Sequence, residues 1–314
     1  MPKILVTAKV NPDIDGTACL VAYADLLSQS GRSAEGFAFG QLSSEAEYFV
    51  QHQGLSIPTH FDDGLGDWSE FVLVDMSSAK GLPKVVKAEK VTEAIDHRSF
   101  TQPEKEFPTA YVQNELVGAA ATLIVERFLK SNLRPQKGQA QLLYGALFEN
   151  TLNFLSTNTT ERDHQAARWL EKEFSIHKGL SQEMFKFSTL RVLADLNRAI
   201  ELDAQEFEGF SKEDCLHALQ LTLFGFDFPG LRSQVEEVVL SLEKGQGVLF
   251  SFLNIVDLEK ARSYLFASNE RGVRVIEQAL GANFEAGWAV LAPPILRKQI
   301  IPKVIPLVKS IDFK

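Results

Sequence analysis

The chain has 314 residues, 45% of them hydrophobic and 23% charged, which is the composition of an ordinary globular protein of about two domains. Its formal net charge is −9, so nucleic acid and anionic membranes, which are themselves negative, are poor partners. The longest apolar stretch, around residues 117–125, is too short to span a bilayer. Cys19 and Cys215 lie far apart, which excludes a disulfide scaffold and a CxxC zinc site and suits a reducing cytoplasm.

In the first half of the chain, short apolar runs alternate with stretches whose apolar residues recur at helical spacing. The apolar runs predict strands over residues 4–6, 36–40, 71–74 and 91–95. The other stretches predict helices over residues 15–27, 44–50, 117–129 and 139–147. Strands that alternate with helices pair in parallel, so the sequence predicts an α/β fold that binds ligands at the carboxyl ends of its strands.

The second half is expected to form a smaller α/β unit after a weakly patterned stretch at residues 178–189, the predicted linker. Helices are predicted over residues 193–207, 231–242 and 271–280. Strands are predicted over residues 218–224 and 248–255. Pro293 and Pro294 interrupt the chain before an apolar segment at residues 295–304.

Two carboxylates follow the first predicted strand in the segment Asn-Pro-Asp-Ile-Asp-Gly at residues 11–16. Its proline and glycine favour a turn, which places Asp13 and Asp15 between a strand end and a helix start. Two carboxylates this close repel each other, and a divalent cation relieves the repulsion. The alternative is that Asp15 only caps the helix that begins near Thr17.

Two further predicted strands lead directly into Asp75 and into Asp96-His97. Because the carboxyl ends of parallel strands meet at one edge of a sheet, these residues predict a metal site together with Asp13 and Asp15. Oxygen ligands with one imidazole favour Mn or Mg over structural zinc, and two ions about 3.5–4 Å apart would serve phosphoryl hydrolysis. The alternative for Asp75 and His97, taken singly, is that each only forms a hydrogen bond at a loop end.

The order of these motifs resembles the DHH phosphoesterase superfamily: a strand followed by Asn-Pro-Asp-x-Asp, then a strand ending in Asp, then a strand ending in Asp-His. Within it, the chain resembles the manganese-dependent (family II) inorganic pyrophosphatases, and the segments at residues 203–207 and 297–299 extend the resemblance to nearly the whole chain. The resemblance implies a DHH metal-binding domain with a mostly parallel sheet at residues 1–187. It also implies a DHHA2-like α/β substrate domain at residues 190–314, and a homodimer.

The resemblance implies a role for each candidate site residue. The metal ligands, for one or two ions of Mn, Mg or Co, would be Asp13, Asp15, Asp75, His97 and Asn150. The catalytic set would be the first four of these with Arg98. The substrate would contact Lys9, Gln205, Arg297 and Lys298.

Several of these positions differ from the family pattern. Lys9 stands where the pattern has a histidine ligand, and Asn150 stands where it has an aspartate ligand. Arg98 replaces the second histidine of the Asp-His-His signature. Gln205 and Leu296 stand where the pattern has a lysine and an arginine for the substrate.

Two functions are therefore expected from the sequence. The first is a metal-dependent phosphoanhydride hydrolase, similar to a manganese-dependent pyrophosphatase or an exopolyphosphatase, with weak activity or an altered substrate. The second is a catalytically degenerate homologue that binds a phosphate ligand or acts as a scaffold dimer. Pyrophosphate or another small phosphate compound is the expected ligand in both, and metal-dependent release of phosphate distinguishes them.

Overall fold

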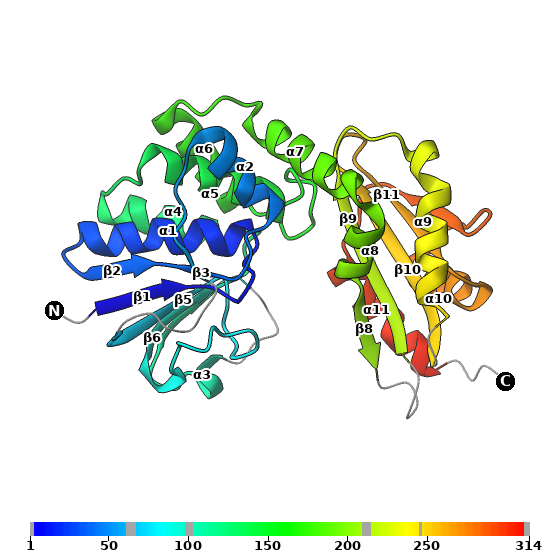
Figure 1. The fold of residues 1–314 in the computed structure, drawn as a ribbon, viewed down its shortest axis with the longest axis horizontal. Helices are drawn as coiled ribbons and strands as arrows, with labels where there is room; N and C mark the ends of the chain where they lie inside the picture. The colour runs from blue at the N-terminus through cyan, green and yellow to red at the C-terminus, as the bar shows by residue number, and fades with distance from the viewer. Residues whose placement is uncertain (1–2, 61–66, 98–102, 209–214, 245–246, 311–314) are drawn as a thin grey trace. The chain divides into compact units, whose positions relative to one another are not determined.

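A computed structural model describes residues 3–60, 67–97, 103–208, 215–244 and 247–310 of the chain. Contacts between residues divide the chain into two compact units, Met1–Phe187 and Ser188–Lys314 (Figure 1). Within the described ranges, no helix has both the length and the apolar character needed to cross a membrane.

Five parallel strands form the central sheet of the N-terminal unit. In spatial order they are β2 (Ser33–Gly36), β1 (Lys3–Thr7), β5 (Glu70–Val74), β6 (Val91–Asp96) and β7 (Tyr111–Asn114). The chain goes from β1 to β2 on one side and later continues with β5 on the other side of β1. The strand order thus reverses between β1 and β5, and such a switch point is where open α/β sheets bind ligands.

Helices cover this sheet and form a second layer above it. They are α1 (Ile14–Gln29), α2 (Ser44–Gln53), α4 (Ala120–Ser131), α5 (Lys137–Asn150) and α6 (Glu161–Phe174), whereas the short helix α3 (Pro103–Glu106) lies on the other side of the sheet (Figure 1). A 3-10 turn, η1 (Ala88–Lys90), and the short pair β3 (Ala38–Phe39) and β4 (Thr59–His60) complete the unit. Helices α1 and α4 lie against the sheet, and α5 packs on both of them (Figure 1).

The central strands β1 and β5 of the N-terminal unit are continuous apolar runs because both faces of the sheet are buried there. Ile4, Leu5 and Val6 on β1 are at most 1% exposed. Leu5 packs with Leu73 of β5 and Phe107 in a cluster on one face. Burial on both faces is the usual condition of a parallel sheet, and it holds the carboxyl edge of the strands in place.

Helix α5 approaches α1 and α2 closely at Gly145. A Cβ atom there would lie 2.7 Å from Cζ of Phe49 and 3.0 Å from Cδ1 of Ile14. We expect Gly145→Ala to lower the free energy of unfolding by about 1–3 kcal/mol, because an overpacked core forces its neighbours off their rotamers. Urea denaturation measures the change. Gly138→Ala in the same helix is the matched control, because its Cβ would meet the movable tip of Leu55; equal losses in the two variants would contradict the packing argument.

The C-terminal unit is built on a mixed sheet. In spatial order its strands are β12 (Trp288–Leu291), β11 (Arg262–Ala267), β10 (Val248–Asp257), β9 (Cys215–Leu223) and β8 (Gln205–Glu208). Strands β9 and β10 are parallel, and the other neighbours are antiparallel. Helices α8 (Leu196–Asp203) and α9 (Phe228–Leu242) pack on one face, and α10 (Glu270–Leu280) and α11 (Arg297–Ser310) pack on the other.

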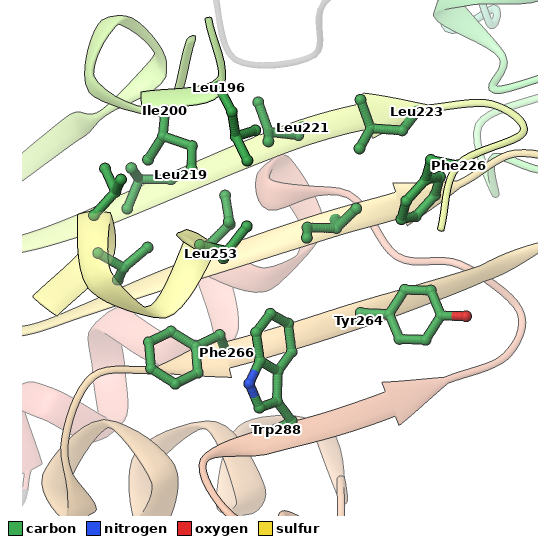
Figure 2. Packing of buried hydrophobic residues seen from close by; sticks show 14 residues of the cluster. Leu196, Ile200, Leu219, Leu221, Leu223, Phe226, Leu253, Tyr264, Phe266 and Trp288 are labelled. Atoms are coloured by element: carbon green, nitrogen blue, oxygen red, sulfur yellow. The ribbon is translucent and has the colours of Figure 1, made fainter. Parts of the chain in front are cut away.

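Alternation along the strands explains why this second sheet is also covered on both faces. Figure 2 shows Leu219 and Leu253 among the side chains that pack with Leu196 of α8. Ala218 and Phe252, one residue earlier on the same strands, belong to the cluster on the opposite face. This period of two is the geometry of a β-strand, and it makes the C-terminal unit a three-layer structure of its own.

The predicted fold class is confirmed: the chain is α/β, with a parallel N-terminal sheet and a smaller C-terminal unit. The boundary between the units, after Phe187, falls within the stretch predicted as the linker at residues 178–189, but the chain is helical there, because α7 (Leu180–Ala194) runs through it. The apolar residues of α7 do not form one buried stripe: Leu180 and Met184 are buried, but Leu190 is 68% exposed. The helical pattern is therefore weak although the helix is long.

Two predicted elements have the wrong extent. The helix expected over residues 193–207 covers the last residues of α7 and the whole of α8. Helical structure ends at Asp203, because residues 205–208 pair with β9 as the edge strand β8. The strand expected over residues 36–40 is split between β2 and β3. Gly36 lies at the break: a Cβ there would lie 2.5 Å from the carbonyl oxygen of Leu20, so the backbone touches α1 at this point.

Candidate metal centre

Three of the predicted ligands meet at the carboxyl edge of the N-terminal sheet. Asp15 lies in the first turn of α1, Asp75 directly follows β5, and His97 directly follows β6. All three are buried, and each offers a ligand atom within 4.8 Å of those of the other two. They converge because β1, β5 and β6 are parallel neighbours that end at the same edge.

The imidazole of His97 is oriented by a backbone carbonyl. Its Nδ1 lies 3.1 Å from the oxygen of Val117, and because a carbonyl only accepts, Nδ1 carries a proton. Its Nε2 lies 3.4 Å from Oδ1 of Asp75 and 3.7 Å from Oδ2 of Asp15. In the neutral ring Nε2 holds the lone pair, so this orientation points a metal-ligating nitrogen at the two carboxylates.

The carboxylate of Asp15 is fixed by the N-terminus of α4. Its two oxygens accept from the backbone N–H groups of Ala120 and Ala121, both at 2.8 Å. The thiol of Cys19 lies 3.5 Å from Oδ1, and burial raises the pKa of that thiol, so it remains a donor. Helix α4 has no side-chain cap of its own. Asp15 therefore supplies the acceptor that its first turn needs.

Asp75 adopts a left-handed backbone conformation, with φ at 52°. Such a conformation costs a non-glycine residue of order 1 kcal/mol, although aspartate tolerates it better than most. Gly16 lies beside this carboxylate, but it is Ala8 that leaves no space for a side chain: a Cβ at Gly16 would lie 2.9 Å from Cβ of Ala8 and at an ordinary contact distance of 3.5 Å from Oδ2 of Asp75. The backbone strain thus lies at Asp75 itself, the residue at which the chain leaves β5 and whose carboxylate joins the cluster.

The chemistry of this donor set fits a divalent cation. Burial and the charge of Asp75 raise the pKa of Asp15 to about 7, because two carboxylates without water around them repel each other. A cation among them offsets both effects. Carboxylate oxygens with one imidazole nitrogen suit Mn²⁺ or Mg²⁺ better than a structural zinc ion.

The stability of the metal-free protein is expected to fall as pH rises from about 4 to about 7. The pKa of Asp15 moves from 3.8 to about 7 on folding, so in this window the folded state keeps a proton that the unfolded chain has lost. The stabilising contribution is full below the lower value and is lost as pH rises through the upper one. Its slope is at most about 1.4 kcal/mol per pH unit.

Urea denaturation in the presence of EDTA measures this slope across the window. Asp15→Asn should remove its share of the pH dependence, because the amide does not titrate. Asp195→Asn is the matched control, since Asp195 caps α8 by accepting from the backbone N–H of Arg198 at 3.1 Å. Parallel stability curves for the parent and Asp15→Asn would show that Asp15 does not titrate as expected.

Asp13 lies outside the group of three ligands within the described residues. Its Oδ1 accepts from the backbone N–H of Gly16 at 3.1 Å, which makes Asp13 the N-cap of α1. The alternative in which Asp15 only caps this helix is therefore wrong. The other oxygen of Asp13 accepts from Nζ of Lys9 at 2.7 Å. An ammonium thus pairs with this carboxylate from the position where the family pattern has a histidine.

Asn150 is the last residue of α5. Its Nδ2 is buried and has no hydrogen-bond partner among the residues that the structure describes. Arg98 lies outside the described residues.

The C-terminal candidates lie in the second unit. Gln205 is exposed at the start of β8, and Lys298 lies in the first turn of α11. Arg297 forms an ion pair with Asp203 and also donates to the carbonyl oxygens of Asp203 at 3.0 Å and Ala218 at 3.2 Å. Its guanidinium therefore holds the start of α11 against α8 and β9.

The backbone groups around the cluster were missed by the sequence analysis. Val117, Ala120 and Ala121 touch His97 and Asp15 through main-chain atoms, so their side chains carry no signal of this role. One indication was available in Val117-Gly118-Ala119-Ala120-Ala121. A helix that begins there has no Ser, Thr, Asp or Asn to cap it, and its N–H groups must find an acceptor elsewhere.

The parallel sheet and the cluster at its carboxyl edge together define an α/β domain with a candidate metal centre, and residues 3–147 match the DHH family, N-terminal domain. The N-terminal unit thus contains a DHH-family domain. The whole chain is 28% identical over 309 residues to the manganese-dependent inorganic pyrophosphatase of Bacillus subtilis, covering 96% of this chain and 97% of that relative. A probable manganese-dependent inorganic pyrophosphatase of Bacillus cereus is 26% identical with the same coverage.

Two solved structures support the fold. A putative family II inorganic pyrophosphatase of Methanococcus jannaschii superposes with a TM-score of 0.73 at 21% identity, covering 98% of this chain and all of the other. An exopolyphosphatase-related protein of Bacteroides fragilis gives a TM-score of 0.51 at 14% identity, covering 98% of this chain and 92% of the other. At these identities the two structures establish a shared fold.

Proposed function

We propose that this protein is a metal-dependent phosphoanhydride hydrolase, similar to a manganese-dependent inorganic pyrophosphatase or an exopolyphosphatase. The observation that carries the proposal is the buried group of Asp15, Asp75 and His97 at the switch point of a DHH-family sheet. The names of the full-length relatives support pyrophosphate as the substrate class. The class of reaction is hydrolysis of a phosphorus–oxygen–phosphorus anhydride.

Asp15, Asp75 and His97 would hold the metal ion, and Asp13 and Asn150 are proposed as further ligands. A bound divalent ion would polarise a phosphoryl oxygen and lower the pKa of a water molecule. The protein's own contribution is to fix the ligands: Val117 keeps the proton of His97 on Nδ1, and the N-terminus of α4 holds Asp15. We keep Lys9, Arg98, Gln205, Arg297 and Lys298 as proposed contacts to phosphate oxygens.

The substituted positions set the expected level of activity. With Lys9 paired to Asp13 and an amide at position 150, we expect at most one well-filled metal ion and slow turnover. The same ion pair favours the second candidate function, a degenerate homologue that binds a phosphate ligand without hydrolysing it. The homodimer and the cytoplasmic location stay predictions.

A hydrolysis screen tests the proposal. Pyrophosphate, polyphosphate and small phosphodiesters are each incubated with the protein and Mn²⁺, Co²⁺ or Mg²⁺, and released phosphate or product is measured. We expect release from pyrophosphate or polyphosphate with Mn²⁺, and loss of that release with EDTA and in Asp75→Asn. Thermal stabilisation by pyrophosphate without release under any metal would instead establish the degenerate homologue. Cleavage of the phosphodiesters alone would overturn the substrate class.

A further inference from the structure

One backbone segment contacts two of the three candidate ligands. Residues 117–121 lead from β7 into α4. The carbonyl of Val117 accepts from His97, and the N–H groups of Ala120 and Ala121 donate to Asp15. Main-chain atoms make all three contacts, so the place of the backbone sets both the orientation of the imidazole and the position of the carboxylate.

This segment is held by the carboxylate of Asp163 in the first turn of α6. Asp163 is 0% exposed, and both of its oxygens lie 3.0 Å from the backbone N–H of Gly118. It also accepts from the hydroxyl of Thr122. Thr160 adds its backbone N–H and its hydroxyl, each at 2.7 Å. A buried carboxylate with these donors is rigidly placed, because any shift leaves N–H or O–H groups unpaired.

The contact at Gly118 leaves no space for a side chain. A Cβ there would lie 2.5 Å from Cγ2 of Thr151 and 2.9 Å from Oδ2 of Asp163. The segment is therefore pressed against residues from α6 and from the end of α5. If the side chain of Asp163 moves, the backbone of Gly118 must move with it, and the neighbouring main-chain groups of Val117 and Ala120 are then displaced as well.

We propose that Asp163 is a positioning residue of the metal centre, which acts through Gly118 on His97 and Asp15. Its carboxylate accepts from Gly118, Thr122 and Thr160 rather than binding the metal ion itself. The inference rests on the proposed function in one respect, namely that Asp15, Asp75 and His97 bind a metal ion. It does not depend on which phosphate compound is hydrolysed, or on turnover.

The test is the affinity of Asp163→Asn for Mn²⁺, measured by calorimetry without substrate. The amide keeps the volume of the carboxylate but replaces one acceptor with a donor, so the N–H of Gly118 or a threonine hydroxyl loses its partner. We expect the dissociation constant to rise at least about tenfold, as outer-shell substitutions in metal sites do. In the metal-free protein, the ¹⁵N shifts of the His97 ring should also change. A purely structural helix cap would move neither quantity.

Asp195→Asn is the matched control, because it also removes a helix-capping carboxylate, that of α8. It should lower thermal stability with unchanged Mn²⁺ affinity. If Asp163→Asn does not fold, Thr122→Val carries the test, since it removes a single donor from Asp163 and should weaken Mn²⁺ binding a few-fold.

Mn²⁺ affinity and His97 shifts equal to those of the parent, in a folded Asp163→Asn or in Thr122→Val in its place, would overturn the positioning role. Asp75→Asn separates the two levels of the argument. If it also binds Mn²⁺ like the parent, the metal site itself is wrong and the role of Asp163 with it. If it loses Mn²⁺ while Asp163→Asn does not, the proposed site stands and the role of Asp163 fails.

Discussion

His97→Asn is expected to weaken Mn²⁺ binding and metal-dependent phosphate release by at least about a hundredfold, beyond the 10–100-fold typical of an outer-shell partner. The side-chain amide of asparagine can replace Nδ1 as the donor to Val117 O, so the backbone contact is retained. What is lost is Nε2, the atom that lies 3.4 Å from Asp75 and 3.7 Å from Asp15. The substitution thus separates ligation from packing.

Calorimetry with Mn²⁺ and a phosphate-release assay measure the two effects, and circular dichroism checks that the variant is folded. His52→Asn is the matched control, because His52 is an exposed residue near the end of α2 that stacks on Tyr48. It should leave Mn²⁺ affinity unchanged. A folded His97→Asn protein with the parent's affinity would show that the imidazole is not a ligand, and the proposed metal centre would fall with it.

The carboxyl edge of the N-terminal sheet could be predicted because its signals are local in sequence. The central strands β1 and β5 are short apolar runs, Asp75 stands immediately after β5, and His97 stands immediately after β6. Parallel pairing then brings them together without further information. The same reasoning placed Asp15 in the first turn of α1, where the structure has it.

What could not be predicted depends on contacts between distant segments. Asp163 is 45 residues from Gly118 in sequence, and nothing near Asp163 distinguishes it from an ordinary helix-capping residue. The edge strand β8 follows a helix of the expected pattern and exists because it pairs with β9. Strand β7 is four residues long and largely solvent-accessible, so it lacks the apolar run that identified the inner strands.

The motif that contains Arg297 could be recognised from the sequence, but the contacts of Arg297 depend on residues far from it in the chain. The segment Arg-Lys-Gln indicated a cation for phosphate. In the structure, the guanidinium of Arg297 pairs with Asp203, itself part of the other segment that suggested the family. Two motif segments 94 residues apart thus contact each other. A sequence pattern specifies the residue types, but the ion pair follows from α8 and α11 lying against β9.

The double variant Lys9→His with Asn150→Asp is expected to raise Mn²⁺-dependent pyrophosphate turnover by at least about tenfold, or roughly 1.4 kcal/mol of barrier. Both changes supply a ligand where the family pattern has one. The ion pair that they disrupt is a small obstacle. The side chains of Lys9 and Asp13 are 37% and 36% exposed, and a pair this accessible to water is worth at most about 1 kcal/mol.

The missing ligands, rather than the strength of the Lys9–Asp13 pair, should therefore limit this protein. An ammonium neutralises charge, but it cannot lower the pKa of a water molecule as a divalent ion does. The gain should accordingly appear in kcat more than in KM. Lys9→Met is the matched control: it removes the charge without adding an oxygen or nitrogen ligand, and it should give no such gain. If the double variant binds two Mn²⁺ ions and still turns over no faster than the parent, Lys9 and Asn150 are not limiting, and the substitutions at Gln205 and Leu296 or a different substrate become the explanation.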